Sequence, residues 1–378
     1  MNHMQRLTLV PVLAVASGSM ANTTGIVGAL LMIGVLIFLH EMGHFLFAKR
    51  MGLPVEVFSL GFGPRIFGFR WKETDVRVAA LPLGGYVKLA GYNPEEPDAE
   101  DPHGFLKQPY HRRMLFYSGG ILANLVTAYL LLSVMGIDQS RITSATPQPS
   151  PLVVLEVVPD SPAAQAGFFP GDLIRQFGEL RFPGATSGEA ITYIQARPGQ
   201  AIPVTLEKDG RTRTTRITPR SEGGRGKVGI KFSPTEVTYT RRPVAFRDVW
   251  RGPVLGALET ASLTGQVFQG FYRLVSFQAS IREVGGPIAI VKGGSDAAKS
   301  GWAGFLMFMA FISLNLAVLN ALPIPFLDGG HMAMLTFEKL RGRDLTVQLK
   351  EKILMGGFYF LISLMAFVLA LDLWRLKS

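Results

Sequence analysis

Residues Gly25–Phe47 read GIVGALLMIGVLIFLHEMGHFLF, and this run decides the fold class. A transmembrane helix needs about 20 consecutive, mostly apolar residues. Three further runs meet that requirement, at Met114–Ile137, Trp302–Leu322 and Ile353–Leu373. We therefore predict a polytopic α-helical membrane protein with about four transmembrane helices.

The composition of the 378-residue chain agrees with this prediction. Charged residues make up only 17% of the chain, against about 25% in ordinary soluble domains. The sequence has no Cys, which excludes disulfides, thiolate nucleophiles and Cys-ligated metals. The formal net charge of +10 suits either nucleic acid or an anionic membrane surface. The apolar runs favour membrane lipid as the partner and argue against nucleic acid.

Basic residues beside the four runs predict the orientation of the chain. They follow the first run, precede the second and separate the third from the fourth, in this order: Lys49, Arg50, Arg112, Arg113, Lys339, Arg341, Arg343, Lys350 and Lys352. If every run crosses the membrane once, all these bases lie on one side, which is then the cytoplasmic side. The segment 138–301 is then expected outside, and the protein is expected in a bacterial inner membrane.

Changes in composition divide the chain into six segments. Residues 1–24 have the pattern of a short signal-like stretch or of a misassigned start. The others are the first two helices with a β region (25–137), a linker (138–152), an inserted domain (153–235), an amphipathic helical stretch (241–285) and the last two helices (286–378). Short β-branched runs and one helix-like stretch from Ser161 predict an α+β fold for the inserted domain.

The segment Val55–Leu89 follows the first helix directly and lacks helical periodicity. It alternates apolar with polar residues and is interrupted by Gly and Pro, which predicts a β-hairpin or small sheet. Its many Phe, Leu and Val residues indicate that this β region is associated with the membrane.

The first run contains His40-Glu41-Met42-Gly43-His44, a His-Glu-x-x-His motif. At 3.6 residues per turn, His40 and His44 lie on one helix face and can bind one Zn²⁺. Glu41 lies beside them, placed to take a proton from a water molecule. Three ionisable residues within one turn of a membrane helix are costly and normally mark a functional site.

A catalytic zinc site needs a third protein ligand and an open position, and without Cys that ligand must be His, Asp or Glu. Asp328, in the stretch NALPIPFLDGGH at 320–331, is the best candidate because it follows the third run at the predicted depth of the histidines. Pro323 and Pro325 break the helix there, so Asp328 is expected in an irregular segment turned inward. His331 is a rival ligand, and otherwise has a supporting or packing role.

Four features together resemble the site-2 protease family of intramembrane zinc metalloproteases. They are the His-Glu-x-x-His motif, the Asn-x-x-Pro-x-Pro-x-Leu-Asp-Gly-Gly stretch from Asn320 to Gly330, the segment Gly120–Asn124 and the domain between the second and third spans. Within the family, the chain is similar to the bacterial regulators of sigma-E proteases. The resemblance implies an endopeptidase that cleaves transmembrane segments of single-span membrane proteins, such as anti-sigma factors or remnant signal peptides.

The same resemblance implies roles for individual residues. His40, His44 and Asp328 would be the zinc ligands, and Glu41 would be the catalytic base. Substrate binding would fall to residues around the third helix end: Asn315, Asn320, Pro323 and Pro325. The alternative for the two asparagines is interhelical hydrogen bonding, and Asn124 is expected to serve packing.

The inserted domain resembles a PDZ domain through the run DSPAAQAGFFPGDLI from Asp160 to Ile174. PDZ domains capture extended peptides or C-termini by adding a strand to a sheet edge. The resemblance implies such a partner, and a gatekeeping role that excludes substrates with bulky outer domains. Enteric bacterial members of this group carry two tandem PDZ domains, whereas this chain has room for one.

The β region suggests how a substrate is held. A peptide bond inside a helix is hydrogen-bonded and shielded, so the substrate must be extended, and an exposed strand edge can pair with it. We hypothesise that Val76–Ala80 or Gly84–Lys88 supplies this edge, with these contacts: Val76, Val78, Gly84 and Gly85. The alternative is a packed lid without substrate contact.

A function of another class is a non-catalytic membrane scaffold, with a structural metal and a PDZ domain that binds C-termini. Glu41 argues against it, because a structural metal site needs no base. A metal-ion transporter is a third possibility, but it would require charged residues in the second and third runs, which have none.

Overall fold

The computed structural model describes residues 23–92, 101–147, 151–233, 237–276, 278 and 285–377. The N-terminal segment considered above falls almost entirely on residues 1–22, outside the described residues. The described chain divides into a helical unit, which ends at Ser140 and resumes at Ala245, and an inserted unit at Arg141–Val244.

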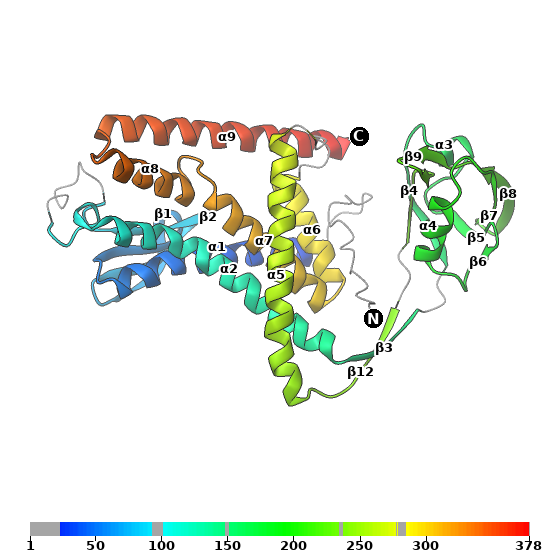
Figure 1. The fold of residues 1–378 in the computed structure, drawn as a ribbon, viewed down its shortest axis with the longest axis horizontal. Coiled ribbons are helices and arrows are strands. Elements are labelled where there is room, and N and C mark those ends of the chain that lie inside the picture. The colour runs from blue at the N-terminus through cyan, green and yellow to red at the C-terminus, as the bar shows by residue number, and fades with distance from the viewer. Residues whose placement is uncertain are drawn as a thin grey trace. The chain divides into compact units, whose positions relative to one another are not determined.

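Four long apolar helices dominate the helical unit (Figure 1). They are α1 (Thr23–Arg50), α2 (Tyr110–Ser140), α7 (Trp302–Ala321) and α9 (Val347–Lys377). Each helix covers its predicted run in full, except that α7 ends one residue earlier than predicted. Each is long and apolar enough to cross a membrane. The fold class predicted from the sequence, a polytopic helical membrane protein, is therefore confirmed.

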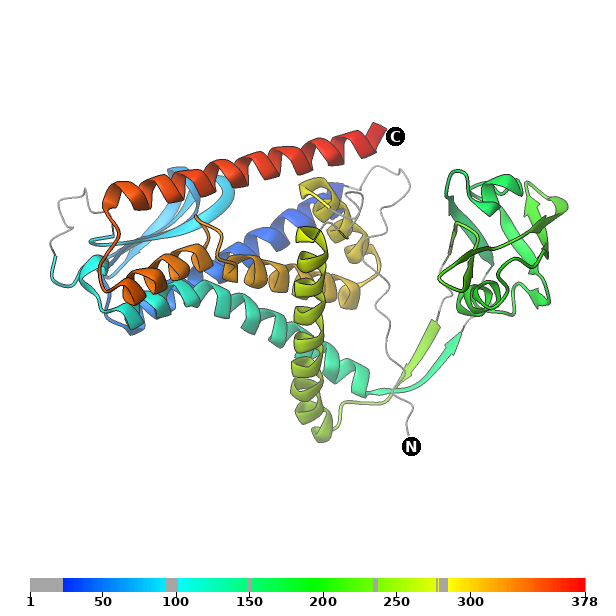
Figure 2. The same cartoon turned by 45° about the horizontal axis from the view of Figure 1, so that its top comes forward.

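Further helices join the four apolar ones. They are η2 (Phe105–Lys107), α5 (Phe246–Val275), α6 (Pro287–Lys299) and α8 (Asp328–Arg341). The amphipathic pattern predicted α5, which runs across the direction of the long helices in both views (Figure 1 and Figure 2). The sequence analysis missed α6 and α8 as separate helices, because each lies next to an apolar run that dominated the pattern.

Small residues let α1 and α2 approach each other closely. A methyl group built on Gly119 of α2 would lie 2.8 Å from the carbonyl oxygen of Gly43 in α1. The same device joins α2 to α5, where Gly252 and Gly256 of α5 face Ser133 of α2. Small residues at such contacts are how membrane helices gain packing energy without a hydrophobic driving force.

The predicted β region is present as β1 (Val55–Trp71) and β2 (Thr74–Leu89), which pair antiparallel. Both strands bend, so that each contributes two paired segments. Residues 57–60 of β1 pair with 85–88 and with 75–78 of β2, and 75–78 pair also with 67–70 of β1. Phe58, for example, is partnered by Val87 and also by Val76, and Val76 is partnered again by Phe69. The pairings place 84–89 and 65–71 at the two edges and 74–78 in the interior.

This register corrects one sequence-based hypothesis. Val76 is partnered by Phe58 and Phe69, and Val78 is partnered by Leu60 and Phe67. Val76 and Val78 therefore cannot offer a free strand edge, although alternation of side chains suggested one. Alternation reveals which face a residue occupies but not how many neighbours its backbone has.

The inserted unit has the expected α+β fold. Its main sheet has the order β11-β4-β5-β7-β8, with β6 beside β5 and a separate pair of β9 and β10. The elements are β4 (Leu152–Val157), α3 (Pro162–Gln165), β5 (Leu173–Phe177), β6 (Leu180–Arg181), α4 (Ser187–Gln195), β7 (Ile202–Lys208), β8 (Arg211–Ile217), β9 (Arg220–Glu222), β10 (Arg225–Lys227) and β11 (Ile230–Phe232). Ser161 caps α3, as predicted, by accepting a hydrogen bond from the Ala164 N–H.

The segment 138–152, predicted as a linker, contains a strand. β3 (Ile142–Pro147) pairs antiparallel with β12 (Val237–Arg241), so that the two chain connections of the inserted unit form a ribbon. The pairing brings together residues about 95 positions apart, and such distant pairing leaves no local signal in a Pro- and Ser-rich stretch.

Candidate metal centre

The two histidines of α1 are placed by the contact with α2. Because Gly43 and Gly119 let the two backbones meet, the imidazoles of His40 and His44 lie directly over Gly120 of α2. A methyl group on Gly120 would overlap both rings, at 2.5 Å from Cε1 of His40 and in contact with Nε2 of His44. The absence of a side chain at this position is what leaves room for the pair.

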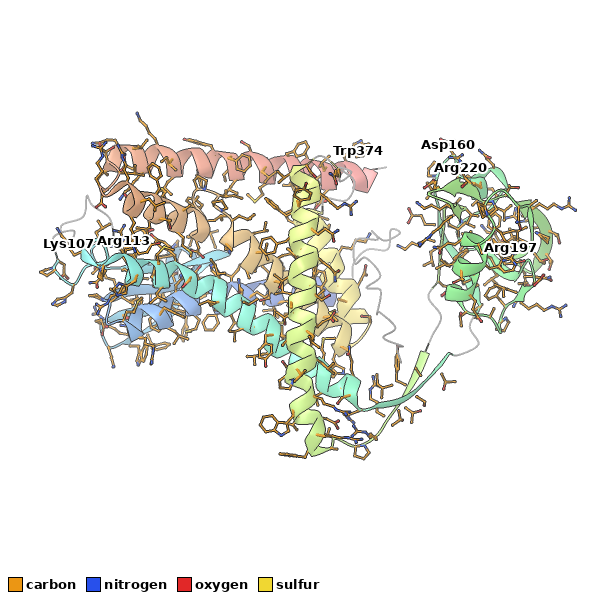
Figure 3. The ribbon with its side chains drawn as sticks, in the orientation of Figure 1. Lys107, Arg113, Asp160, Arg197, Arg220 and Trp374 are labelled. Carbon is orange, nitrogen blue, oxygen red and sulfur yellow. The ribbon has the colours of Figure 1, made fainter. Side chains whose placement is uncertain are left out.

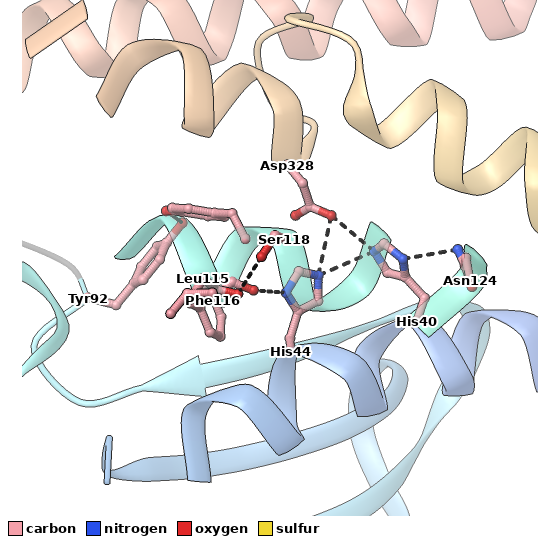
Figure 4. A network of polar contacts seen from close by, with 9 residues as sticks. His40, His44, Tyr92, Leu115, Phe116, Ser118, Asn124 and Asp328 are labelled. Carbon is pink, nitrogen blue, oxygen red and sulfur yellow. Dashed lines mark hydrogen bonds and ion pairs between the residues drawn. The ribbon is translucent and has the colours of Figure 1, made fainter. Parts of the chain in front are cut away.

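Three ligand atoms converge at this point (Figure 4). The Nε2 atoms of His40 and His44 are 3.3 Å apart, and the Oδ2 atom of Asp328 is 3.4 Å and 3.3 Å from them. The three side chains are 13%, 7% and 14% exposed. Sequence reasoning had selected this set, and the structure brings its members together.

The spacing fits a zinc ion. Zinc binds nitrogen and oxygen ligands at about 2.0–2.1 Å in tetrahedral geometry, which sets adjacent ligand atoms about 3.3 Å apart. The triangle of two nitrogens and one oxygen has edges of 3.3 to 3.4 Å. Oδ2 of Asp328 is buried and has no hydrogen-bond partner of ordinary geometry among the described residues. A buried carboxylate oxygen facing two imidazoles is explained by a cation between them.

Asp328 reaches the histidines from the start of α8 rather than from an irregular segment, and this corrects the sequence-based expectation. The chain turns after α7, and Gly330 allows the first turn of α8 to pack on Ile324, because a methyl group there would meet the Ile324 carbonyl. Asp328 can bind a metal through its carboxylate, which must be ionised to act as a ligand.

Glu41 lies beside the ligand cluster and packs against the β region. A methyl group on Gly85 of β2 would lie 2.7 Å from Cγ of Glu41. Gly85 thus leaves the space that the glutamate side chain occupies, and it places the edge segment 84–89 next to the site. The candidate contact Gly84 has a φ of +127°, a conformation that glycine adopts readily.

The other candidate substrate residues do not join the ligand cluster. The amide nitrogen of Asn315 donates to the carbonyl oxygen of Phe311, 2.8 Å away in the same helix, and Asn320 is half-buried near the end of α7. Pro323 is exposed, whereas Pro325 packs against Gly357 of α9. Their substrate-binding roles remain predictions.

His331 lies one turn after Asp328 and stacks on Tyr117, with ring centroids 4.7 Å apart and an interplanar angle of 4°. Burial lowers the pKa of its imidazole. The described group of residues able to share one metal contains His40, His44 and Asp328, without His331. The stacked packing role agrees with the second of the two alternatives drawn from the sequence.

We expect His331→Ala to retain bound zinc. Its removal takes away a stacking partner but no ligand atom, so turnover should fall by no more than about tenfold, the lower end for residues that support a ligand. Zinc content of the purified full-length variant checks this, with Asp328→Asn as the comparison that should lose zinc. Loss of zinc from His331→Ala would transfer the ligand role to His331.

Sequence reasoning gave too small a role to α2. The Nδ1 atom of His44 lies 2.9 Å from the Phe116 carbonyl oxygen, and the Nδ1 atom of His40 lies 3.1 Å from the amide nitrogen of Asn124 (Figure 4). A signal was present, because Gly120 and Asn124 are four residues apart and so share a face of an apolar helix. Asn124 had nevertheless been assigned to packing.

A model of peptidase family M50, the site-2 protease family, matches residues 28–364. The chain belongs to this family. A relative from Nostoc sp. is 33% identical over 368 residues, which cover 93% of this chain and 97% of its own length. The chloroplastic membrane metalloprotease ARASP of Arabidopsis thaliana is 30% identical, with 95% and 81% covered. The zinc metalloprotease RasP of Oceanobacillus iheyensis is 27% identical, with 93% and 99% covered.

One solved structure also matches part of the M50 chain. It is the PDZ domain of an SdrC-like protein from Listeria monocytogenes, with 25% identity, 21% of this chain and 85% of that chain covered, and a TM-score of 0.20.

The family membership confirms three predictions made from the sequence. The M50 chain is a zinc metalloendopeptidase, its cofactor is zinc, and it is a membrane protein. The non-catalytic scaffold and the metal-ion transporter, which the sequence analysis had kept as alternatives, are correspondingly disfavoured.

Proposed function

We propose that this M50 protein is an intramembrane endopeptidase that cleaves the transmembrane segments of single-span membrane proteins. One observation carries the proposal: the His40–His44 motif lies inside α1, a helix long and apolar enough to span a membrane, and its ligand atoms meet Asp328 there. A hydrolytic site at that depth has access to peptide bonds that soluble proteases cannot reach. Substrates of this kind include anti-sigma factors and remnant signal peptides.

The chain's own residues divide the chemistry as follows. His40, His44 and Asp328 would hold the zinc ion, which when bound lowers the pKa of water and polarises a peptide carbonyl. Glu41 accepts the proton of the attacking water and later delivers it to the leaving amine. The side chain of Glu41 is half-buried against Gly85, and this contact limits the directions in which its carboxylate can point.

The edge segment Gly84–Lys88 would hold the substrate in an extended form. Its backbone is partnered by Val57–Leu60, and its Gly85 touches the proposed base. A substrate strand paired to this edge therefore passes the catalytic carboxylate. Without such pairing, the scissile carbonyl would stay in its helical hydrogen bond.

Proline substitutions test this edge. In the edge segment 84–88, Gly84 and Gly85 are kept, because Gly84 has a positive φ and Gly85 faces Glu41. At alternating positions in 86–88, proline removes an outward N–H, and KM should rise about tenfold for a lost hydrogen bond of about 1.4 kcal/mol. At 76–78, which are partnered on both sides, every proline should instead lower the unfolding temperature. Steady-state kinetics and thermal unfolding of each full-length variant check both expectations. Unchanged KM across 86–88 would contradict the edge role and favour a packed lid.

We further propose that the inserted unit is a PDZ domain that binds an extended peptide or a C-terminus. A cavity of about 400 Å³ lies between α4 and the strand β11. Apolar residues of both elements line it, and they include Ile191, Ile194, Ile230 and Phe232. β11 pairs with β4 and faces this cavity, which is where an added peptide strand would lie. Such binding suits a gatekeeper that admits substrates only after their outer part has been trimmed.

The distribution of bases supports the proposed orientation. Lys107 and Arg113 lie at one end of the helical unit. Trp374, near the C-terminal end of α9, lies at the opposite end of the unit (Figure 3). The last turn of α1 carries Lys49 and Arg50. By the positive-inside rule the basic end is cytoplasmic, which puts the inserted unit on the outer side of a bacterial inner membrane.

Membrane proteomics tests the proposed substrates. Cells that carry Glu41→Gln should accumulate trimmed single-span proteins or short transmembrane peptides that are absent from cells with the wild-type chain. Cells that carry Glu351→Gln, which changes an exposed carboxylate near the start of α9, serve as the matched control. Identical membrane proteomes in the wild type and Glu41→Gln would reject intramembrane cleavage.

A further inference from the structure

Asn124 is a polar residue of α2 that contacts the proposed metal centre. It is fully buried, and its amide nitrogen is 3.1 Å from Nδ1 of His40. Its Oδ1 atom is buried and has no hydrogen-bond partner among the described residues. An unpaired carbonyl oxygen in an apolar helix bundle is costly, so its position needs an explanation.

The chemistry of His40 supplies that explanation. Its Nε2 atom faces Asp328 and His44, so Nε2 must carry a lone pair to bind a metal. The imidazole proton is then on Nδ1, and Nδ1–H needs an acceptor. An amide nitrogen is itself a donor and cannot accept this proton. The two ends of an asparagine amide are not distinguished by shape and are assigned from hydrogen bonds.

We propose that Asn124 is a positioning residue that accepts the Nδ1–H of His40 through its Oδ1 atom and so fixes the metal-binding tautomer. Turning the amide by 180° brings Oδ1 to His40 and gives the Nδ1–H of His40 its acceptor, while the Nδ2 group takes the position on the other side of the amide. This inference rests on the proposed role of His40 as a zinc ligand.

The second histidine shows the same arrangement made from backbone. Nδ1 of His44 lies 2.9 Å from the carbonyl oxygen of Phe116, which can only accept. Phe116 and Asn124 are placed four residues before and after Gly120, so α2 presents one acceptor to each ring on either side of the glycine.

The position of Asn124 is held from the other side by α7. The hydroxyl of Ser313, which is fully buried, donates to the backbone carbonyl of Asn124 at 2.8 Å.

The test compares variants of the full-length protein in detergent, with zinc affinity measured by competition against a chelator of known affinity. Asn124→Leu keeps the branching at Cγ but removes the acceptor, and it should lower zinc affinity about 10- to 100-fold. The carboxylate introduced by Asn124→Asp cannot donate but accepts well. The zinc affinity of this variant should stay within about threefold of the wild type, because carboxylates commonly support zinc-bound histidines. Asn124→Ala replaces the Leu variant if the latter fails to fold. Thr127→Ala removes a hydroxyl of α2 that bonds to the Ala123 carbonyl of the same helix, and it should leave zinc affinity unchanged.

Two outcomes overturn the inference. Equal loss of affinity in Asn124→Leu and Asn124→Asp would show that the amide donates or merely packs, and wild-type affinity in Asn124→Leu would show that it does not act on His40. His40→Ala separates this inference from the proposed function. If His40→Ala keeps its zinc, the ligand assignment itself fails, whereas zinc loss in His40→Ala with normal Asn124 variants refutes only the role of Asn124.

Discussion

Glu41→Gln should lower the turnover of a transmembrane peptide substrate by about 10²- to 10⁴-fold, the range expected for loss of a general base. The amide is nearly the same size as the carboxylate and fits the space beside Gly85, but it cannot take a proton from water. Glu41 is adjacent in sequence to the proposed ligand His40, yet it is not among the three residues whose possible ligand atoms converge. Zinc affinity should therefore stay unchanged.

Two measurements on one preparation decide this prediction, the rate of cleavage and the zinc content of the purified full-length protein. Glu351→Gln changes an exposed carboxylate near the start of α9, and it should leave both quantities unaltered. Loss of zinc from Glu41→Gln would make this residue a ligand rather than a base. A fully active variant would remove it from the chemistry altogether.

The sequence was sufficient to predict the features that depend on local spacing. Hydropathy located α1, α2, α7 and α9 because a membrane span requires a long apolar run. The four-residue spacing of His40 and His44 fixed their shared face of α1, since helix geometry is local. Asp328 was selected because a zinc site needs a third ligand, which could not be Cys. It also follows a span at the predicted depth of the two histidines.

The features that escaped prediction depend on contacts between distant segments. The pairing of Val76 on both sides could not be predicted from the alternation of apolar and polar residues. Alternation shows which face of the sheet a side chain occupies, but not how many strands lie beside it. The role of Asn124 depends on α2 crossing α1 at Gly43, and one polar residue in an apolar run is compatible with packing as well. The start of α8 at Asp328 was hidden because Pro323 and Pro325 indicate where a helix stops but not where the next begins.

Glycine 120 gives the second large effect, and it shows that the site depends on close packing as much as on ligand chemistry. A methyl group there would lie 2.8 Å from Nδ1 and 2.5 Å from Cε1 of His40. Overpacking of this kind costs about 1–3 kcal/mol, and Gly120→Ala should therefore weaken zinc binding by about 5- to 150-fold if the strain falls on the histidines. Zinc affinity by chelator competition measures it.

Gly34→Ala is the matched control for this prediction. Gly34 is also helical, in α1, but a methyl group there meets nothing within 4 Å. Alanine is the better helix former by about 0.5–1 kcal/mol, so Gly34→Ala should keep zinc affinity and slightly raise thermal stability. The higher helix propensity of alanine also applies to Gly120→Ala. A weaker helix would therefore not explain a loss of zinc affinity in that variant. Equal affinities in the two variants would mean that the histidine rings can move aside, and that α2 does not fix their geometry.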